Sequence, residues 1–242
     1  MTLAYRGEPF HGWQTQPNAV SVQSTVEGAL ATILRRPVPI VGAGRTDAGV
    51  NARMMVAHLD IPDEFDPSSP RFLTALNSLC GRDIAIYSFR EVAADAHARF
   101  DATSRTYRYF VHTRKDPFKG GLSWQAPATL DFGAMNHAAQ MMLGKRDFTS
   151  FSKLHTDVRT NICDLRRACW VEAGPDEWYF EITADRFLRN MVRAVVGTLV
   201  DVGRGKITPR NVLDIIGRMD RCAAGTSMPP GPLFLWNVEY PW

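Results

Sequence analysis

Residues 167–183, RACWVEAGPDEWYFEIT, contain two segments of strand character joined by four turn-forming residues. Aromatic and β-branched side chains mark residues 167–173 and 178–183, and Gly-Pro-Asp-Glu at 174–177 favours a tight turn between them. A hairpin makes neighbouring strands antiparallel, whereas parallel strands need a crossover connection, usually a helix. The stretch therefore argues against a doubly wound parallel sheet. It predicts an α+β fold, with a largely antiparallel sheet covered on one face by helices.

The rest of the chain interleaves helices and strands in the same manner. Apolar spacing and start signals predict helices over residues 22–34, 70–79, 132–143, 186–202 and 209–219. Strand character is found at residues 2–5, 56–61, 84–91, 106–112, 167–173, 178–183 and 233–240. Charge changes sign along the chain: residues 1–98 carry 8 Lys/Arg against 10 Asp/Glu, and residues 99–242 carry 20 against 15. We expect two α+β halves, residues 1–100 and residues 101–242.

Composition excludes several classes of protein. The 242 residues are 45% hydrophobic and 22% charged, which is typical of a globular chain and not of a disordered, collagen-like or coiled-coil one. No run of about 18 apolar residues is present, and the N-terminus lacks the apolar core of a signal peptide, so we expect a cytoplasmic protein without a membrane segment. Its cysteines show no Cys-x-x-Cys spacing and its histidines no paired motif, so free thiols are favoured over disulfides or zinc.

A glycine-rich segment at residues 42–50, Gly-Ala-Gly-Arg-Thr-Asp-Ala-Gly-Val, gives the densest signal of chemistry. Its glycines allow a sharp turn and close approach to a ligand, and Arg45 offers a charge partner for Asp47. The segment fits neither a dinucleotide fingerprint nor a phosphate-binding Walker loop, because glycines and lysine are missing at the required positions. An aspartate in such a loop is most often a turn residue, so Asp47 indicates a site only with support from elsewhere.

Two further segments carry basic side chains at regular spacing. In the strand over residues 105–112, alternation puts aromatic and basic side chains side by side, an arrangement suited to stacking on bases beside phosphates and equally consistent with an ordinary core strand. The helix over residues 186–202 is predicted to have an apolar face and an opposite basic face with Arg186, Arg189 and Arg193. A solvated surface is the usual explanation of such a basic face.

Together these segments resemble the tRNA pseudouridine synthase A (TruA) family, nearly from end to end. Residues 44–50, Gly-Arg-Thr-Asp-Ala-Gly-Val, match the active-site motif of that family. Further matches follow in family order at residues 12–14, 21–23, 100–103, 107–109, 147–151, 187–193 and 238–241. The resemblance implies two ferredoxin-like or RRM-like halves, joined into one bent, mostly antiparallel mixed sheet with a central cleft. It also implies a homodimer that isomerises uridine to pseudouridine at positions 38, 39 and 40 of the tRNA anticodon stem-loop.

The resemblance assigns a role to four residues. Asp47 matches the catalytic aspartate, Tyr107 the tyrosine that stacks on the flipped uracil, and Arg193 the arginine that pairs with the aspartate. Arg45 is the arginine of the motif and is expected to fill the space around the flipped nucleotide or to contact the backbone there. The reaction needs no metal, redox agent or nucleotide cofactor. Asp47 can attack C1′, add to C6 or take a proton from C2′, and the sequence does not choose among these routes.

The chain departs from the family pattern at three places. Asn51 stands where the motif usually has His, and we expect altered RNA contact there rather than lost catalysis. The first strand begins closer to the N-terminus than is usual, so we expect a clipped edge strand or a start codon further upstream. Residues 228–232, Met-Pro-Pro-Gly-Pro, replace a less proline-rich approach to the last strand.

Two other functions compete with the isomerase as explanations of this sequence. A tRNA-binding protein or chaperone on the same fold, without catalysis, would be expected to lose the nucleophile first, yet Asp47, Tyr107 and Arg193 are all present. A metal-dependent nuclease or phosphatase needs clustered carboxylates or histidines, and the motif offers a single aspartate. The isomerase is therefore the favoured function and the non-catalytic tRNA-binding protein is the alternative.

Overall fold

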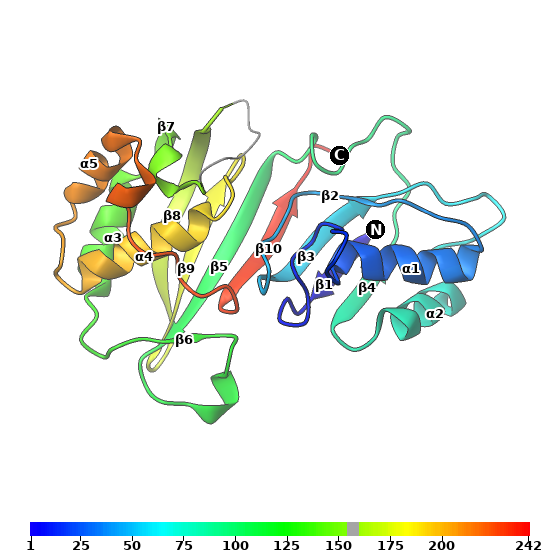
Figure 1. Ribbon diagram of the computed structural model, residues 1–242, viewed down its shortest axis with the longest axis horizontal. Coiled ribbons are helices and arrows are strands. Elements are labelled where there is room, and N and C mark those ends of the chain that lie inside the picture. Colours follow the sequence, from blue (N-terminus) through cyan, green and yellow to red (C-terminus); the bar gives the residue numbers. More distant parts are fainter. Residues whose placement is uncertain (154–159) are drawn as a thin grey trace. The chain divides into compact units, whose positions relative to one another are not determined.

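A computed structural model describes residues 1–153 and 160–242 and divides into two compact units. The first unit combines Met1–Thr103 with Phe234–Trp242, and the second is Ser104–Leu233. Both units contain helices and strands (Figure 1), which confirms the expected α+β class. The last strand thus belongs with the N-terminal residues. Residues 1–100 and 101–242 as separate domains stay a prediction.

The first unit holds two helices and five strands among its described elements. They are β1 (Thr2–Tyr5), α1 (Val22–Leu34), β2 (Val41–Gly42), β3 (Asn51–His58), α2 (Pro70–Cys80), β4 (Ile84–Ser88) and β10 (Leu233–Glu239). The strands lie in the order β4-β1-β3-β10, with β2 also on β3. Strand β1 is antiparallel to both β4 and β3, whereas β10 runs parallel to β3.

Helix signals in the first unit act as the sequence predicts. The Ser21 side chain accepts the backbone N–H of Ser24 and caps α1, and Ser69 caps α2, which has proline at its start. The two helices pack against each other, and α2 packs on β4. Helix and strand side chains meet in one core, formed by the fully buried Leu3, Val22, Val26, Leu30, Met55 and Leu76.

The second unit is built around an antiparallel sheet with the order β5-β9-β8-β7. Its strands are β5 (Ser104–His112), β6 (Trp124–Gln125), β7 (Gly144–Asp147), β8 (Ile162–Gly174) and β9 (Glu177–Ala184). Its helices are α3 (Phe132–Met141), α4 (Met191–Gly203) and α5 (Asn211–Arg218), with 3₁₀ turns at Pro117–Lys119, Thr149–Phe151 and Arg221–Ala223. Helix α3 packs on α4 and on β8, and the short β6 runs parallel to β5.

The hairpin that predicts the fold is formed by β8 and β9. Gly174 pairs with Glu177, so the turn between the strands consists of Pro175 and Asp176. Asp176 adopts a φ of 62°, in the left-handed region that aspartate tolerates better than most residues. The tight connection makes β8 and β9 antiparallel, as expected from residues 167–183, and the pairs β5–β9 and β7–β8 are antiparallel as well.

A helix is present where residues 186–202 predicted one, but its start and its basic face were predicted wrongly. Helix α4 begins at Met191, because Asn190 before it adopts a left-handed φ of 67° and the chain cannot continue a helix through that residue. Arg186 and Arg189 therefore lie in an irregular segment before the helix. Of the 13 residues in α4, 11 are buried, so nearly all sides of the helix are covered.

Strand boundaries also differ from those expected. Strand β3 covers 51–58 instead of 56–61, because pairing with β1 and β10 holds its polar first residues in the sheet. Strands β2, β6 and β7 were not expected: β2 and β6 are two residues long, and β7 reads Gly-Lys-Arg-Asp, without apolar alternation. Within residues 1–153 and 160–242, no helix combines the length and apolar character needed to cross a bilayer.

The free thiols expected from the sequence provide a test of this packing. Burial raises the pKa of Cys80 to about 11 and that of Cys163 to about 12, whereas Cys222 is exposed. Because the thiolate is the reactive form, we expect iodoacetamide at pH 8 to label Cys222 first and to reach Cys80 and Cys163 only after unfolding. Peptide mass spectrometry over time reads this order, and early labelling of Cys163 in the folded protein would contradict the packing of β8.

Candidate active site

The glycine-rich motif forms the connection between β2 and β3 and carries Arg45 and Asp47. Arg45 is exposed and Asp47 is half-buried, while Thr46 between them is buried. The carbonyl oxygen of Thr46 accepts the backbone N–H of Trp13 at 3.2 Å, and its hydroxyl lies 2.8 Å from the hydroxyl of Tyr5. The backbone next to Asp47 is therefore fixed by residues from β1 and the segment after it.

Two glycines let the segment over residues 7–13 lie directly on this loop. Gly12 has a φ of 92°, and a Cβ atom there would lie 2.5 Å from the carbonyl oxygen of Thr46. A Cβ on Gly7 would overlap the carbonyl oxygen of Val50. Both positions need glycine for close backbone approach, and Gly12 also needs it for its φ. The loop is consequently held from both sides of Asp47.

Asn51, which replaces the usual histidine of the motif, has a structural role in this unit. Its side chain is 1% exposed, and its Oδ1 accepts the backbone N–H of Gly7 at 2.7 Å. A buried amide in this position joins the start of β3 to the segment that covers the loop. The structure therefore gives Asn51 a part in holding the loop, where the sequence predicted an effect on RNA contact.

Tyr107 lies on β5 in the second unit. It pairs with Ile182 of β9, and its half-buried ring meets Phe187 edge to face, with centroids 5.2 Å apart. Its neighbour Arg108 donates to the carboxylate of Glu181 at 2.7 Å, with its guanidinium 4.4 Å from the Tyr179 ring centroid. Arg108 thus contributes to cross-strand pairing.

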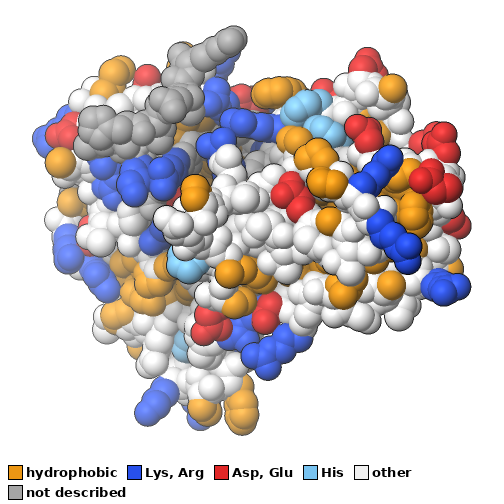
Figure 2. Space-filling model, turned by 45° about the vertical axis from the view of Figure 1, so that its right-hand side comes forward, with side chains coloured by type: hydrophobic (Ala, Val, Ile, Leu, Met, Phe, Trp, Pro, Cys, Tyr) orange, Lys and Arg blue, Asp and Glu red, His pale blue; other side chains and the backbone are white. Residues whose placement is uncertain are grey.

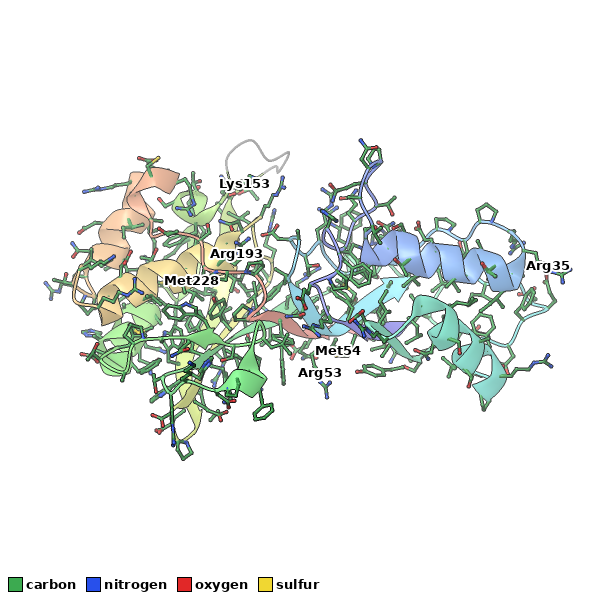
Figure 3. The ribbon with its side chains drawn as sticks, turned by 60° about the horizontal axis from the view of Figure 1, so that its bottom comes forward. Arg35, Arg53, Met54, Lys153, Arg193 and Met228 are labelled. Carbon is green, nitrogen blue, oxygen red and sulfur yellow. The ribbon has the colours of Figure 1, made fainter. Side chains whose placement is uncertain are left out.

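Arg193 is held in the first turn of α4 by a reciprocal pair of hydrogen bonds. Its Nε donates to the carbonyl oxygen of Met228 at 2.6 Å, and the N–H of Met228 donates to the carbonyl oxygen of Arg193 at 3.1 Å. Figure 3 shows both residues, Arg193 on the helix and Met228 on the chain beside it. The Arg193 charge also reaches the buried Tyr109 hydroxyl: burial raises the pKa of Tyr109 and the guanidinium opposes that rise.

Met228 is itself fixed, because hydrogen bonds and a close backbone contact hold residues 224–230 along α4. The N–H of Gly225 donates to the Thr198 hydroxyl at 2.8 Å, and the Ser227 hydroxyl accepts from Asn190 at 2.7 Å and from Arg221 at 2.8 Å. A Cβ on Gly197 would overlap the carbonyl oxygen of Thr226. This glycine in a helix interior therefore marks the place where the two backbones touch.

The four residues proposed from the sequence fall into two groups. Arg45 and Asp47 share the loop of the first unit, and Tyr107 and Arg193 belong to the second unit. Sequence reasoning missed Met228, whose contribution is a backbone carbonyl, and Ser227 and Arg221, which fix it. Gly197 and Gly225 were the available signal, since glycine inside or beside a helix often marks a close contact. Among the residues that the structure describes, no three His, Cys, Asp or Glu gather in a way that could hold a metal ion.

Comparison with known proteins agrees with the motif. A family model described as tRNA pseudouridine synthase matches residues 138–241. The chain is 55% identical over 240 residues to tRNA pseudouridine synthase A of Parabacteroides distasonis, covering 99% of this chain and 94% of that protein. The protein of the same name from Porphyromonas gingivalis is 55% identical over 240 residues, with 99% and 95% covered. That from Bacteroides thetaiotaomicron is 54% identical over 241 residues, with 99% and 89% covered. The chain belongs to the tRNA pseudouridine synthase family.

The contact between α4 and residues 224–230 can be tested with a matched pair of glycines. Gly197→Ala places a methyl group against the Thr226 carbonyl, so we expect it to lower stability by about 1–3 kcal/mol and to reduce activity by moving Met228 away from Arg193. Gly217→Ala in α5 has no atom within 4 Å of the added Cβ and should stabilise the protein by about 0.5–1 kcal/mol. Urea unfolding measures both, and equal effects of the two variants would refute the close contact.

Proposed function

We propose that this chain isomerises uridine to pseudouridine at positions 38, 39 and 40 of the tRNA anticodon stem-loop, with Asp47 as its nucleophile. The observation that carries the proposal is the loop over residues 44–50, which has the motif of the family and is held rigidly on both sides of Asp47. A carboxylate that must meet one ring atom of a substrate gains from such a fixed backbone. Arg45, exposed on the same loop, is available to contact the RNA backbone.

The reaction requires a group that separates and rejoins the base without consuming a co-substrate. The N1–C1′ bond breaks, the uracil turns, the C5–C1′ bond forms, and the proton on C5 is lost while N1 gains one. Asp47 can take part by bonding to C1′, by adding to C6, or by accepting the C2′ proton and returning it. In each case the carboxylate is regenerated, and no metal, redox agent or nucleotide cofactor enters the balance.

Tyr107 and Arg193 complete the proposed site. Tyr107 presents a half-buried ring that meets Phe187 edge to face, and an aromatic ring suits stacking on a flipped uracil. Arg193, fixed by the Met228 carbonyl, is proposed to pair with the Asp47 carboxylate and to keep it oriented. We also propose that the enzyme works as a homodimer in the cytoplasm. There, the excess of Lys and Arg after residue 98 would help to bind tRNA.

The nucleophile is tested by Asp47→Asn, which keeps the size of the side chain and removes its charge. We expect the wild type to release tritium from tRNA labelled with [5-³H]uridine, without added metal or cofactor, and the variant to release none within the assay. Filter binding should give the two proteins nearly the same tRNA affinity, because phosphate contacts spread over the surface dominate binding.

An exposed aspartate of the same unit provides the control. Asp63→Asn lies outside the loop and should release tritium at the wild-type rate. Turnover by Asp47→Asn at a comparable rate would remove Asp47 from its role. If the wild type binds tRNA and releases no tritium, the protein is the non-catalytic tRNA-binding alternative.

The role of Arg193 is tested by Arg193→Lys, which keeps the positive charge and loses the Nε–H that Met228 accepts. We expect the single-turnover rate at saturating enzyme to fall at least ten-fold while the fold is retained. Arg218→Lys, on the exposed surface of α5, should leave the rate unchanged. Thermal unfolding of both variants separates lost positioning from lost stability, and a wild-type rate for Arg193→Lys would show that the fixed guanidinium is dispensable.

A further inference from the structure

A short stack of aromatic rings ends at the surface of the first unit, in the connection between β4 and β5. The rings of His97 and Phe100 are stacked, with centroids 4.2 Å apart and planes at 30°. His58 of β3 meets His97 edge to face, with centroids 4.6 Å apart. Phe100 is the outermost ring, and 75% of it is exposed. Histidine covers one face of the phenyl ring, and the stack ends at Phe100.

The segment that carries this stack is fixed to the sheet of its own unit. The N–H of Ala98 donates to Nδ1 of His58 at 3.0 Å, and the Tyr240 hydroxyl donates to the carbonyl oxygen of Ala98 at 2.6 Å. Ala98 itself is buried. One residue of the loop is therefore anchored both to β3 and to the residue that follows β10.

Hydrogen bonds within the loop fix the His97 ring and the backbone at Phe100. Nδ1 of His97 accepts the backbone N–H groups of Arg99 and Phe100, at 3.1 and 3.3 Å, and the Asp101 carboxylate accepts the N–H of His97 at 2.6 Å. Such a loop loses little conformational freedom when a ligand binds. The backbone that carries the outer phenyl ring is thus held in place beside the His97 ring.

Exposure alone does not distinguish Phe100. Figure 2 shows hydrophobic side chains exposed among charged ones, as on most protein surfaces. Phe118 is more exposed, at 95%, but among the described residues it has no ring stacked on it. Phe100 combines a supported ring with a cation: the guanidinium carbon of Arg99 lies over the ring, 5.8 Å from its centroid.

We propose that the exposed ring of Phe100 stacks on an unpaired nucleobase of the RNA substrate, with the Arg99 guanidinium close to its phosphate. The inference rests on the proposed function, which makes a tRNA stem-loop the substrate. A flat ring that ends a stack accepts another flat ring, and single-stranded RNA offers bases that stack on aromatic and guanidinium groups. Stacking reads no particular base, so the contact contributes affinity and little sequence preference.

Binding of a fluorescently labelled anticodon stem-loop RNA tests the contact. Phe100→Ala is expected to weaken binding about ten-fold, which corresponds to about 1.4 kcal/mol. Because stacking releases no counterions, the slope of log K against log salt between 50 and 300 mM KCl should stay at its wild-type value. Phe100→Tyr keeps an aromatic face and should bind like the wild type. Phe118→Ala is the matched control and should also bind like the wild type.

The outcomes separate this inference from the proposed function. Wild-type RNA affinity of Phe100→Ala would overturn the stacking contact, and so would an equal loss of RNA affinity in Phe118→Ala. A change of oligomeric state in Phe100→Ala alone would also overturn it, because the ring would then contact a second copy of the chain. Tritium release by Phe100→Ala should show a raised KM for tRNA and a kcat near that of the wild type. If the wild type released no tritium while Phe100→Ala still weakened RNA binding, the isomerase would fail and the stacking contact would stand.

Discussion

Contact between two backbones at a glycine is the constraint on which both groups of candidate residues depend. In the first unit, Gly12 lies against the carbonyl of Thr46, beside Asp47. In the second, Gly197 lies against the carbonyl of Thr226, two residues before Met228 and its bond to Arg193. Side chains at these glycines would separate the segments. The positions of a carboxylate and a guanidinium are thus set by main-chain geometry, which varies less than the rotamers of long side chains.

The polar groups around the candidate residues form hydrogen bonds within the protein that keep this arrangement in place. The Thr46 hydroxyl contacts Tyr5, the Asn51 amide holds Gly7, and the Ser227 hydroxyl receives two donors. None of these groups needs to touch a substrate to matter, because each limits the movement of a residue that is proposed to do so. Preorganisation of this kind lowers the free energy needed to reach a reactive geometry.

The sequence predicted those parts of the structure that depend on local patterns. Residues 167–183 indicated the antiparallel hairpin, and the caps Ser21 and Ser69 marked helix starts correctly. The start of α4 was missed because apolar spacing continues through residues 187–191, while the left-handed conformation of Asn190 depends on its surroundings. Asp47 was proposed as a site residue from a motif of seven residues. The role of Met228 could not be predicted in this way. Every residue has a backbone carbonyl, and only the tertiary structure shows which carbonyl accepts a hydrogen bond from Arg193.

The place of β10 has a consequence for the order in which the protein is made. Phe234 and Leu235 pair with Asn51 and Ala52, the first residues of β3 after the loop that carries Asp47. Synthesis runs from the N-terminus, so this edge of β3 stays without its neighbour while the whole second unit emerges from the ribosome. The first unit is thus started first and completed last, and the strand next to the proposed nucleophile gains its parallel neighbour only when almost the entire chain has been translated.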